Sequence, residues 1–152
     1  MIRRIKILTL TGSLASIGFG IWHFFVPSIW NWYAYIDPSA TELVLAVRAI
    51  NLFFSLALVL FGVANVLVVY RAPQERFSLM VLLAASSVLW ATRSVWQLLY
   101  PQGTFHAEVQ YGLLSTFILV FFCFAFSLWL VAKMPSTRRG MSSPRQHIPF
   151  PR

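Results

Sequence analysis

The sequence predicts an all-α membrane protein, built as one bundle of four transmembrane helices that run alternately up and down. Three observations support this fold class: 59% of the 152 residues are hydrophobic, only 11% are charged, and the mean hydropathy is +0.72. Soluble domains usually carry about 25% charged residues. A chain this apolar is expected in a lipid bilayer, where helices satisfy every backbone polar group within the protein.

Long apolar stretches account for almost the whole chain. Each reaches the ~20 residues that a helix needs to cross the hydrocarbon core. They lie at residues 5–26, 43–70, 77–100 and 109–132. These stretches predict a four-helix transmembrane domain over residues 1–132. The remaining segment, 133–152, is rich in Pro, Ser and Arg and has little to bury, so it is predicted to be a disordered basic tail.

The basic residues that give the formal charge of +8 lie mainly on one side of the predicted membrane. One side of the predicted membrane carries the basic residues Arg3, Arg4, Lys6, Arg71, Arg76, Lys133, Arg138, Arg139, Arg145 and Arg152. The other side carries Asp37, Glu42 and Glu108 without a flanking Lys or Arg. The positive-inside rule then predicts a multi-pass protein of the plasma (inner) membrane with both termini in the cytoplasm. Because topology explains the excess charge, the sequence predicts no nucleic-acid partner.

Each predicted helix has one small or polar face, since these residues recur at helical spacings of three and four. The faces comprise Thr9, Ser13, Ser16, Gly20 and His23; Arg48, Asn51, Ser55, Gly62 and Asn65; Ser86, Trp90, Arg93 and Gln97; and Glu108, Tyr111 and Ser115. Membrane helices associate through small residues and interhelical hydrogen bonds, because lipid is as apolar as leucine. The faces are therefore predicted to pack against one another inside the bundle.

The ionisable residues are expected to gather in the outer half of the bundle. At ~1.5 Å per residue, Arg48 and Arg93 both lie roughly 10 Å inward from the outer boundary. The predicted cluster comprises His23, Glu42, Arg48, Asn51, Arg93, Gln97, His106 and Glu108. Charged side chains at membrane depth are costly and usually face the bundle interior or a water-filled cavity.

Two interpretations of this cluster stay open. In the first, Glu42 and Glu108 neutralise Arg48 and Arg93, and the amides complete a structural hydrogen-bond network. In the second, the two arginines face a pocket and hold an anionic group of a small molecule or a lipid. On the second interpretation the protein is an accessory or small-ligand-binding membrane protein with no required chemistry, and the lipid bilayer is its first partner.

The alternative function is a membrane redox protein or enzyme that uses His23 and His106 to bind haem b or a quinone. His23 also suits the end of a helix in an interfacial aromatic belt, beside Trp22 and Phe24 and before Pro27. The sequence contains no HExxH motif and no glycine-rich phosphate loop, and Cys123 is its one cysteine, so no metal site is predicted. A non-enzymatic role without a cofactor is favoured.

The order of Gly20, His23 and Pro27, a short outer loop, and then "ELVLAVRAIN" opening a helix that carries Gly62 resembles DoxX-like and related uncharacterised small four-helix membrane proteins. The segment "NLFFS", which starts at Asn51, stands where those families have glycines. The resemblance implies a bacterial inner-membrane setting and association with a larger membrane complex. A homo-oligomer is the other assembly expected.

Overall fold

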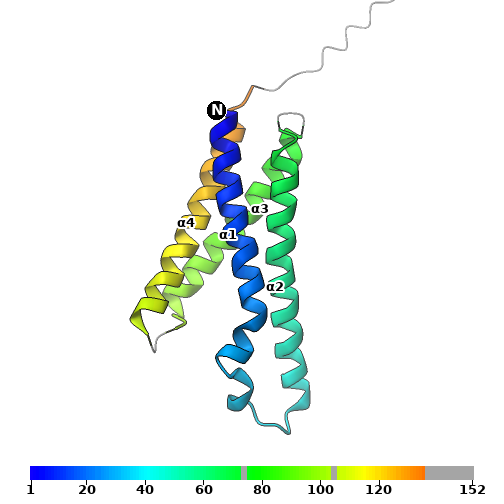
Figure 1. Cartoon of the computed structure of the whole chain (residues 1–152), viewed down its shortest axis with the longest axis vertical. Helices are drawn as coiled ribbons and strands as arrows, with labels where there is room; N and C mark the ends of the chain where they lie inside the picture. Colours follow the sequence, from blue (N-terminus) through cyan, green and yellow to red (C-terminus); the bar gives the residue numbers. More distant parts are fainter. Residues whose placement is uncertain (73–74, 104–105, 136–152) are drawn as a thin grey trace, which may run out of the picture.

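The chain folds into a four-helix membrane bundle in a computed structural model that describes residues 1–72, 75–103 and 106–135 (Figure 1). The described residues form α1 (Ile2–Ile29), the short 3-10 helix η1 (Trp32–Tyr35), α2 (Thr41–Val69), α3 (Arg76–Leu99) and α4 (Ala107–Ala132). All four α-helices are long and apolar enough to cross a membrane. The predicted disordered tail lies, from residue 136 onward, outside the described residues.

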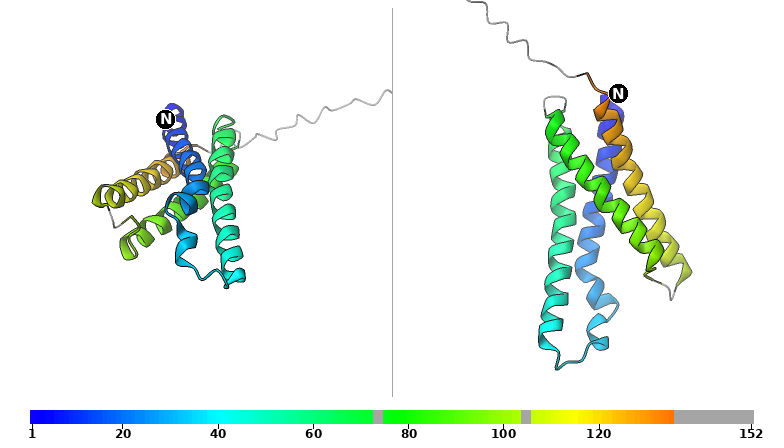
Figure 2. Two further views of the ribbon diagram at one scale, coloured as in Figure 1. Left: turned by 60° about the horizontal axis from the view of Figure 1, so that its bottom comes forward. Right: turned by 180° about the vertical axis from the view of Figure 1, so that it is seen from behind.

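The helices form two hairpins, α1 with α2 and α3 with α4. Packing is most extensive within each hairpin, α1 also packs on α4, and α2 and α3 contact each other least of these pairs. The hairpins meet at the end of the bundle that holds the N-terminus and the last turn of α4, and they diverge toward the opposite end (Figures 1 and 2). We call these the terminal end and the distal end. The distal end carries the α1–α2 and α3–α4 connections.

The close approach of α1 and α2 depends on glycine. A Cβ atom at Gly62 would lie 2.9 Å from the backbone oxygen of Ser13 and 2.5 Å from Cγ1 of Ile17. A Cβ atom at Gly20 would lie 2.9 Å from the backbone oxygen of Ser55. The Ser16 hydroxyl donates a hydrogen bond to the backbone oxygen of Leu58, 3.3 Å away. Small residues thus bring the two backbones together, as the spacing of the polar faces predicts.

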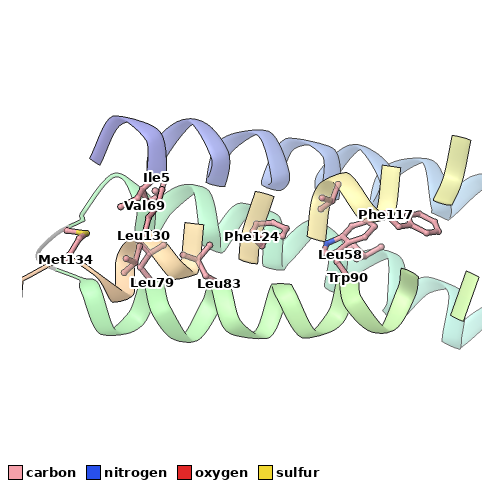
Figure 3. Packing of buried hydrophobic residues seen from close by; sticks show 12 residues of the cluster. Ile5, Leu58, Val69, Leu79, Leu83, Trp90, Phe117, Phe124, Leu130 and Met134 are labelled. Carbon is pink, nitrogen blue, oxygen red and sulfur yellow. The ribbon is translucent and has the colours of Figure 1, made fainter. Parts of the chain in front are cut away.

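The apolar core lies mainly in the terminal half of the bundle, where all four helices meet. Its labelled members in Figure 3 are Ile5, Leu58, Val69, Leu79, Leu83, Trp90, Phe117, Phe124, Leu130 and Met134. Arg76 closes this end, because its guanidinium donates a 2.9 Å hydrogen bond to the backbone oxygen of Ala132. That bond satisfies a carbonyl that the end of α4 would otherwise leave without a partner.

The predicted polar face of α4 is wrong. Glu108, Tyr111 and Ser115 are exposed, whereas α4 buries Phe117, Val120 and Phe124. The first turns of α4 lie in the splayed part of the bundle, where none of the described helices covers their polar side. Because α4 is apolar around most of its circumference, Ser127 is the main polar residue that marks its buried face, and the spacing of Glu108, Tyr111 and Ser115 indicates a different one.

The α1–α2 connection folds back over the distal end. Asn31 adopts a left-handed conformation (φ 48°), which Asn tolerates better than most residues, and η1 follows it. Beyond η1, the Ser39 backbone N–H and hydroxyl both donate hydrogen bonds to the Asp37 carboxylate, at 2.9 and 2.8 Å. These bonds favour the ionised carboxylate and lower the pKa of Asp37 below its ordinary value.

Candidate functional site

Two adjoining cavities occupy the distal half of the bundle, where the hairpins diverge. Their volumes are about 320 and 370 Å³. Both are lined by the same four side chains: His23 of α1, Trp32 of η1, Arg93 of α3, and Gln102 of the α3–α4 connection. Elements from both hairpins therefore converge on one space, which we call the distal cleft.

The two cavities of the distal cleft have different walls. The first is bounded by α1, the two connections and α4, through Phe19, Trp22, Val26, Trp30, Gly103 and Leu113. The second extends between α2 and α3, along Val47, Ile50, Asn51, Phe54 and Trp96. Aromatic and aliphatic side chains dominate both walls, and the polar groups are few. This is the usual composition of a small-molecule site.

An aromatic triad lies beside the distal cleft and joins the two hairpins. Phe19 of α1, Trp90 of α3 and Phe117 of α4 pack with ring centroids 5.1 to 5.7 Å apart. Such tilted and edge-to-face pairs are favourable arrangements of aromatic rings. Arg93 follows Trp90 on α3, and its guanidinium lies over the Phe117 ring, 4.5 Å from the centroid. The triad thus positions the charged group of the distal cleft.

Arg93 is half-buried and has one polar partner among the described residues. Its guanidinium donates a hydrogen bond to the side-chain oxygen of Gln102. A guanidinium has five N–H donors, so this bond and the Phe117 ring leave most of its donors available. In the part of the chain that the structure describes, no carboxylate forms an ion pair with Arg93. The positive charge therefore faces the distal cleft without an internal counter-ion from those residues.

His23 ends a short hydrogen-bonded chain. The Ser55 hydroxyl donates to the backbone oxygen of Asn51 at 2.7 Å, and Nδ1 of His23 lies 3.2 Å from the same hydroxyl oxygen. Since Ser55 has a single hydroxyl proton and already donates it, Nδ1 must carry the proton that bonds Ser55. In the neutral imidazole, Nε2 is then an unprotonated acceptor. The ring is held by edge contacts with Phe54 and Trp32.

Two buried amides complete the polar groups near the distal cleft. Gln97 donates a 2.9 Å hydrogen bond from Nε2 to the backbone oxygen of Gln102, which holds the α3–α4 connection against α3. Asn51 is 8% exposed and lines the second cavity. Its Oδ1 and the Oε1 of Gln97 accept no hydrogen bond from the described residues. Asn51 therefore places a buried acceptor, without a partner among the described residues, beside the second cavity.

The remaining members of the predicted cluster lie outside the distal cleft. Arg48 is exposed and packs over the Tyr33 ring at 5.0 Å. Glu42 and Glu108 are exposed in the first turns of α2 and α4, and His106 is exposed at the start of α4. Within the described ranges, neither glutamate forms an ion pair with an arginine. The structure thus brings together His23, Asn51, Arg93 and Gln97, and it separates Arg48, Glu42, His106 and Glu108 from them.

Sequence reasoning missed Gln102 and Trp32, which line both cavities. Both lie in connections, where helical periodicity gives no information about direction. The available signal was the pair of tryptophans, Trp30 and Trp32, that follow the first predicted helix. The described residues contain no group of three or more His, Cys, Asp or Glu side chains placed to hold a metal ion.

The hydrogen-bond chain predicts the tautomer of His23. In protein with ¹⁵N-labelled histidine, at alkaline pH where the imidazole is neutral, we expect the His23 Nε2 resonance to be that of an unprotonated ring nitrogen. Ser55→Ala removes the acceptor of Nδ1–H and should shift the population toward the Nε2–H form. A His23→Gln sample assigns the resonance. A wild-type Nε2–H signal would contradict the hydrogen bond from Nδ1–H of His23 to the Ser55 hydroxyl.

Comparison with known proteins identifies no relative: no family model matches the chain, and neither the curated proteins nor the solved structures include a significant match. The resemblance to DoxX-like membrane proteins therefore stays a prediction. What the structure shows is a multi-pass membrane protein with an all-α four-helix fold.

Proposed function

We propose that this protein binds a small amphipathic molecule with an anionic group, such as a carboxylate or phosphate, in the distal cleft. The observation that carries the proposal is Arg93, a half-buried arginine that faces a cavity and pairs with no carboxylate among the described residues. A buried guanidinium costs several kcal/mol unless charge or hydrogen bonds compensate it. An anionic ligand would supply that compensation through a bidentate contact.

The walls of the cleft suit the apolar part of such a ligand. Phe19, Trp22 and Leu113 line the first cavity, and its volume of about 320 Å³ is at the lower end of the usual range for small-molecule sites. Arg93 and Gln102 would hold the charged group, and the aromatic side chains would cover the rest of the molecule. This division between a polar anchor and an apolar wall favours amphipathic ligands over inorganic anions.

We also propose that the distal end faces the outside of the cell. Arg3, Arg4 and Lys6 lie at the terminal end, together with Arg76 and Lys133. The positive-inside rule supports a cytoplasmic location for that end, in the plasma membrane. The distal cleft would then lie toward the outer leaflet, where it can exchange a ligand with the exterior or with outer-leaflet lipid.

The redox alternative has less support. A bis-histidine haem site would require His23 and His106 to face one another, whereas His106 is exposed and lines neither cavity. A quinone would need hydrogen-bond partners for its carbonyl oxygens, and Arg93 and Gln102 could provide donors. Quinone binding is therefore compatible with the distal cleft, but a neutral ligand would leave the charge of Arg93 without compensation.

A fluorescence titration in mild detergent tests the proposed function. Octyl phosphate, octanol and octylammonium have the same octyl group and differ in charge. Trp22, Trp30 and Trp32 line the first cavity, so their fluorescence reports whether a ligand occupies it. We expect saturable binding of octyl phosphate and much weaker binding of the other two. Arg93→Gln should weaken octyl phosphate binding roughly tenfold or more, because a charge-assisted hydrogen bond is lost.

Arg48→Gln is the matched control, since Arg48 lies toward the same end of the bundle but lines neither cavity. It should leave the affinity for octyl phosphate unchanged. Equal weakening by both substitutions, or octanol binding as tightly as octyl phosphate, would refute the proposed function.

A further inference from the structure

The contact between α2 and α3 is confined to the terminal half of the bundle. There, Asn65 of α2 donates a 2.8 Å hydrogen bond to the Ser86 hydroxyl of α3, and both residues are buried. Toward the distal end the two helices separate, as Figure 2 shows from behind. The Asn65–Ser86 bond thus marks the closed end of a gap between the two hairpins.

The second cavity of the distal cleft lies along this gap and reaches the lipid-facing surface. Ile50 of α2 is 68% exposed and Trp96 of α3 is 52% exposed, and both line the cavity. Ile50 lies more than two turns inside α2, where an exposed side chain of a membrane-spanning bundle contacts acyl chains, and Trp96 lies in the last turn of α3, nearer the headgroups. The rim of the second cavity is therefore apolar and continuous with the bilayer, and Arg93 lies on its inner wall.

Side chains of the two connections border the distal cleft at the distal end of the bundle. Trp32 lines both cavities from η1, and Trp30 borders the first. Gln102 reaches toward the same space from the α3–α4 connection, where it bonds Arg93. A charged molecule that arrives from water would meet these aromatic side chains, whereas one that arrives from the membrane can pass between α2 and α3.

We infer that the ligand of the distal cleft is an anionic phospholipid with a hydroxylated headgroup, which enters sideways from the bilayer between α2 and α3. This inference rests on the proposed function and names its ligand class. The phosphate would lie at Arg93, and an acyl chain would occupy the gap beside Ile50 and Trp96. A membrane lipid is the occupant that matches both an apolar lateral opening and a cation that pairs with no carboxylate among the described residues.

The headgroup follows from the hydrogen-bonding capacity of the second cavity. Beside the Arg93 donors, the second cavity is lined by His23, whose Nε2 is an unprotonated acceptor in the neutral ring, and by Asn51, whose buried Oδ1 has no hydrogen-bond partner among the described residues. Hydroxyl groups donate to such acceptors without adding charge, whereas an ammonium headgroup would be repelled by Arg93. Phosphatidylglycerol has this chemistry, and phosphatidylmethanol has the same charge without the hydroxyls.

Native mass spectrometry from nanodiscs tests the inference. The nanodiscs contain phosphatidylcholine with equal small fractions of phosphatidylglycerol, phosphatidylmethanol and phosphatidylethanolamine. We expect wild type and Arg48→Gln to retain one phosphatidylglycerol. The fraction of Arg93→Gln that retains this lipid should be at least tenfold lower. Asn51→Leu should retain an anionic lipid but no longer prefer phosphatidylglycerol over phosphatidylmethanol. Retention of phosphatidylethanolamine, or no difference between Arg93→Gln and Arg48→Gln, would overturn the inference.

A second pair of variants tests the lateral path. Ile50→Trp enlarges a side chain in the gap, and Leu52→Trp makes the same change at an exposed α2 position that lines neither cavity. Ile50→Trp should lower phosphatidylglycerol retention severalfold, Leu52→Trp should not, and octyl phosphate should still bind both. Equal lipid retention by the two variants would overturn lateral entry.

Failure of the inference is distinguishable from failure of the proposed function. If octyl phosphate or water-soluble glycerol 1-phosphate binds through Arg93 but no lipid is retained, the proposed function stands and the lipid source is refuted. If neither the lipids nor the soluble phosphates depend on Arg93, both are refuted. Thermal unfolding of each variant establishes that the fold is retained.

Discussion

Replacing Trp90 with alanine is expected to lower the free energy of unfolding by about 3 kcal/mol, the lower end of the usual cost of a buried Trp→Ala change. Trp90 is 1% exposed. It packs against Phe19 of the other hairpin and against Phe117 of its own. Because lipid solvates apolar groups well, the loss comes from packing and aromatic contacts more than from the hydrophobic effect. Unfolding by SDS in mixed micelles, followed by circular dichroism, measures it.

Trp96→Ala is the matched control for Trp90→Ala, since Trp96 lies on the same helix and is half exposed. It should change the free energy of unfolding by well under 1 kcal/mol, as expected for a surface substitution. Trp90→Phe should recover much of the stability that Trp90→Ala loses. If Trp96→Ala and Trp90→Ala cost the same, the aromatic triad does not hold the hairpins together.

Gly62→Leu is expected to destabilise the α1–α2 hairpin by about 3 kcal/mol, the upper end of the usual cost of overpacking. The new Cβ would meet the Ser13 backbone oxygen at 2.9 Å, and a backbone atom cannot move aside as a flexible side chain can. The helices would have to separate and lose the Ser16–Leu58 hydrogen bond. The same SDS titration measures the change.

Gly18→Leu provides the comparison for Gly62→Leu. A Cβ at Gly18 has no atom within 4 Å, and the residue is exposed, so leucine there would face lipid. We expect Gly18→Leu to leave the unfolding free energy unchanged or to raise it slightly, because glycine is a poor helix former. A loss similar to that of Gly62→Leu would show that the cost arises from helix propensity or insertion and not from the α1–α2 contact.

Much of the fold was predictable because a bilayer imposes simple rules. Helix number follows from the lengths of the apolar stretches, and the buried faces of the first three helices follow from the spacing of residues such as Ser13, Ser55 and Ser86. The face of α4 was not predictable. Beyond Ser115 its sequence is apolar except for Thr116, which is exposed, and Ser127, which is buried, and these two residues do not reveal that Phe117 and Phe124 turn inward.

The sequence predicted which kinds of residue form the candidate site better than it predicted which individual residues line it. Arg48 and Arg93 have the same predicted depth, yet the structure separates them: Arg48 packs on Tyr33 at the surface, and Arg93 lines both cavities. Tyr33, which contacts Arg48, and Trp32, which lines the cavities with Arg93, both lie in the α1–α2 connection, just after the left-handed Asn31. No periodic pattern encodes the path of a connection, and for the same reason Gln102 was missed.

The sequence by itself determined that this chain crosses the membrane as four helices, because hydropathy and length act locally along the chain. It also predicted that ionisable residues such as Arg48 and Arg93 lie toward one end of the bundle. Only the tertiary structure decided which of them meet, because that depends on the angle at which the hairpins diverge and on where the connections fold back. Divergence of the hairpins created the distal cleft, and the register of α3 placed Arg93 on its wall.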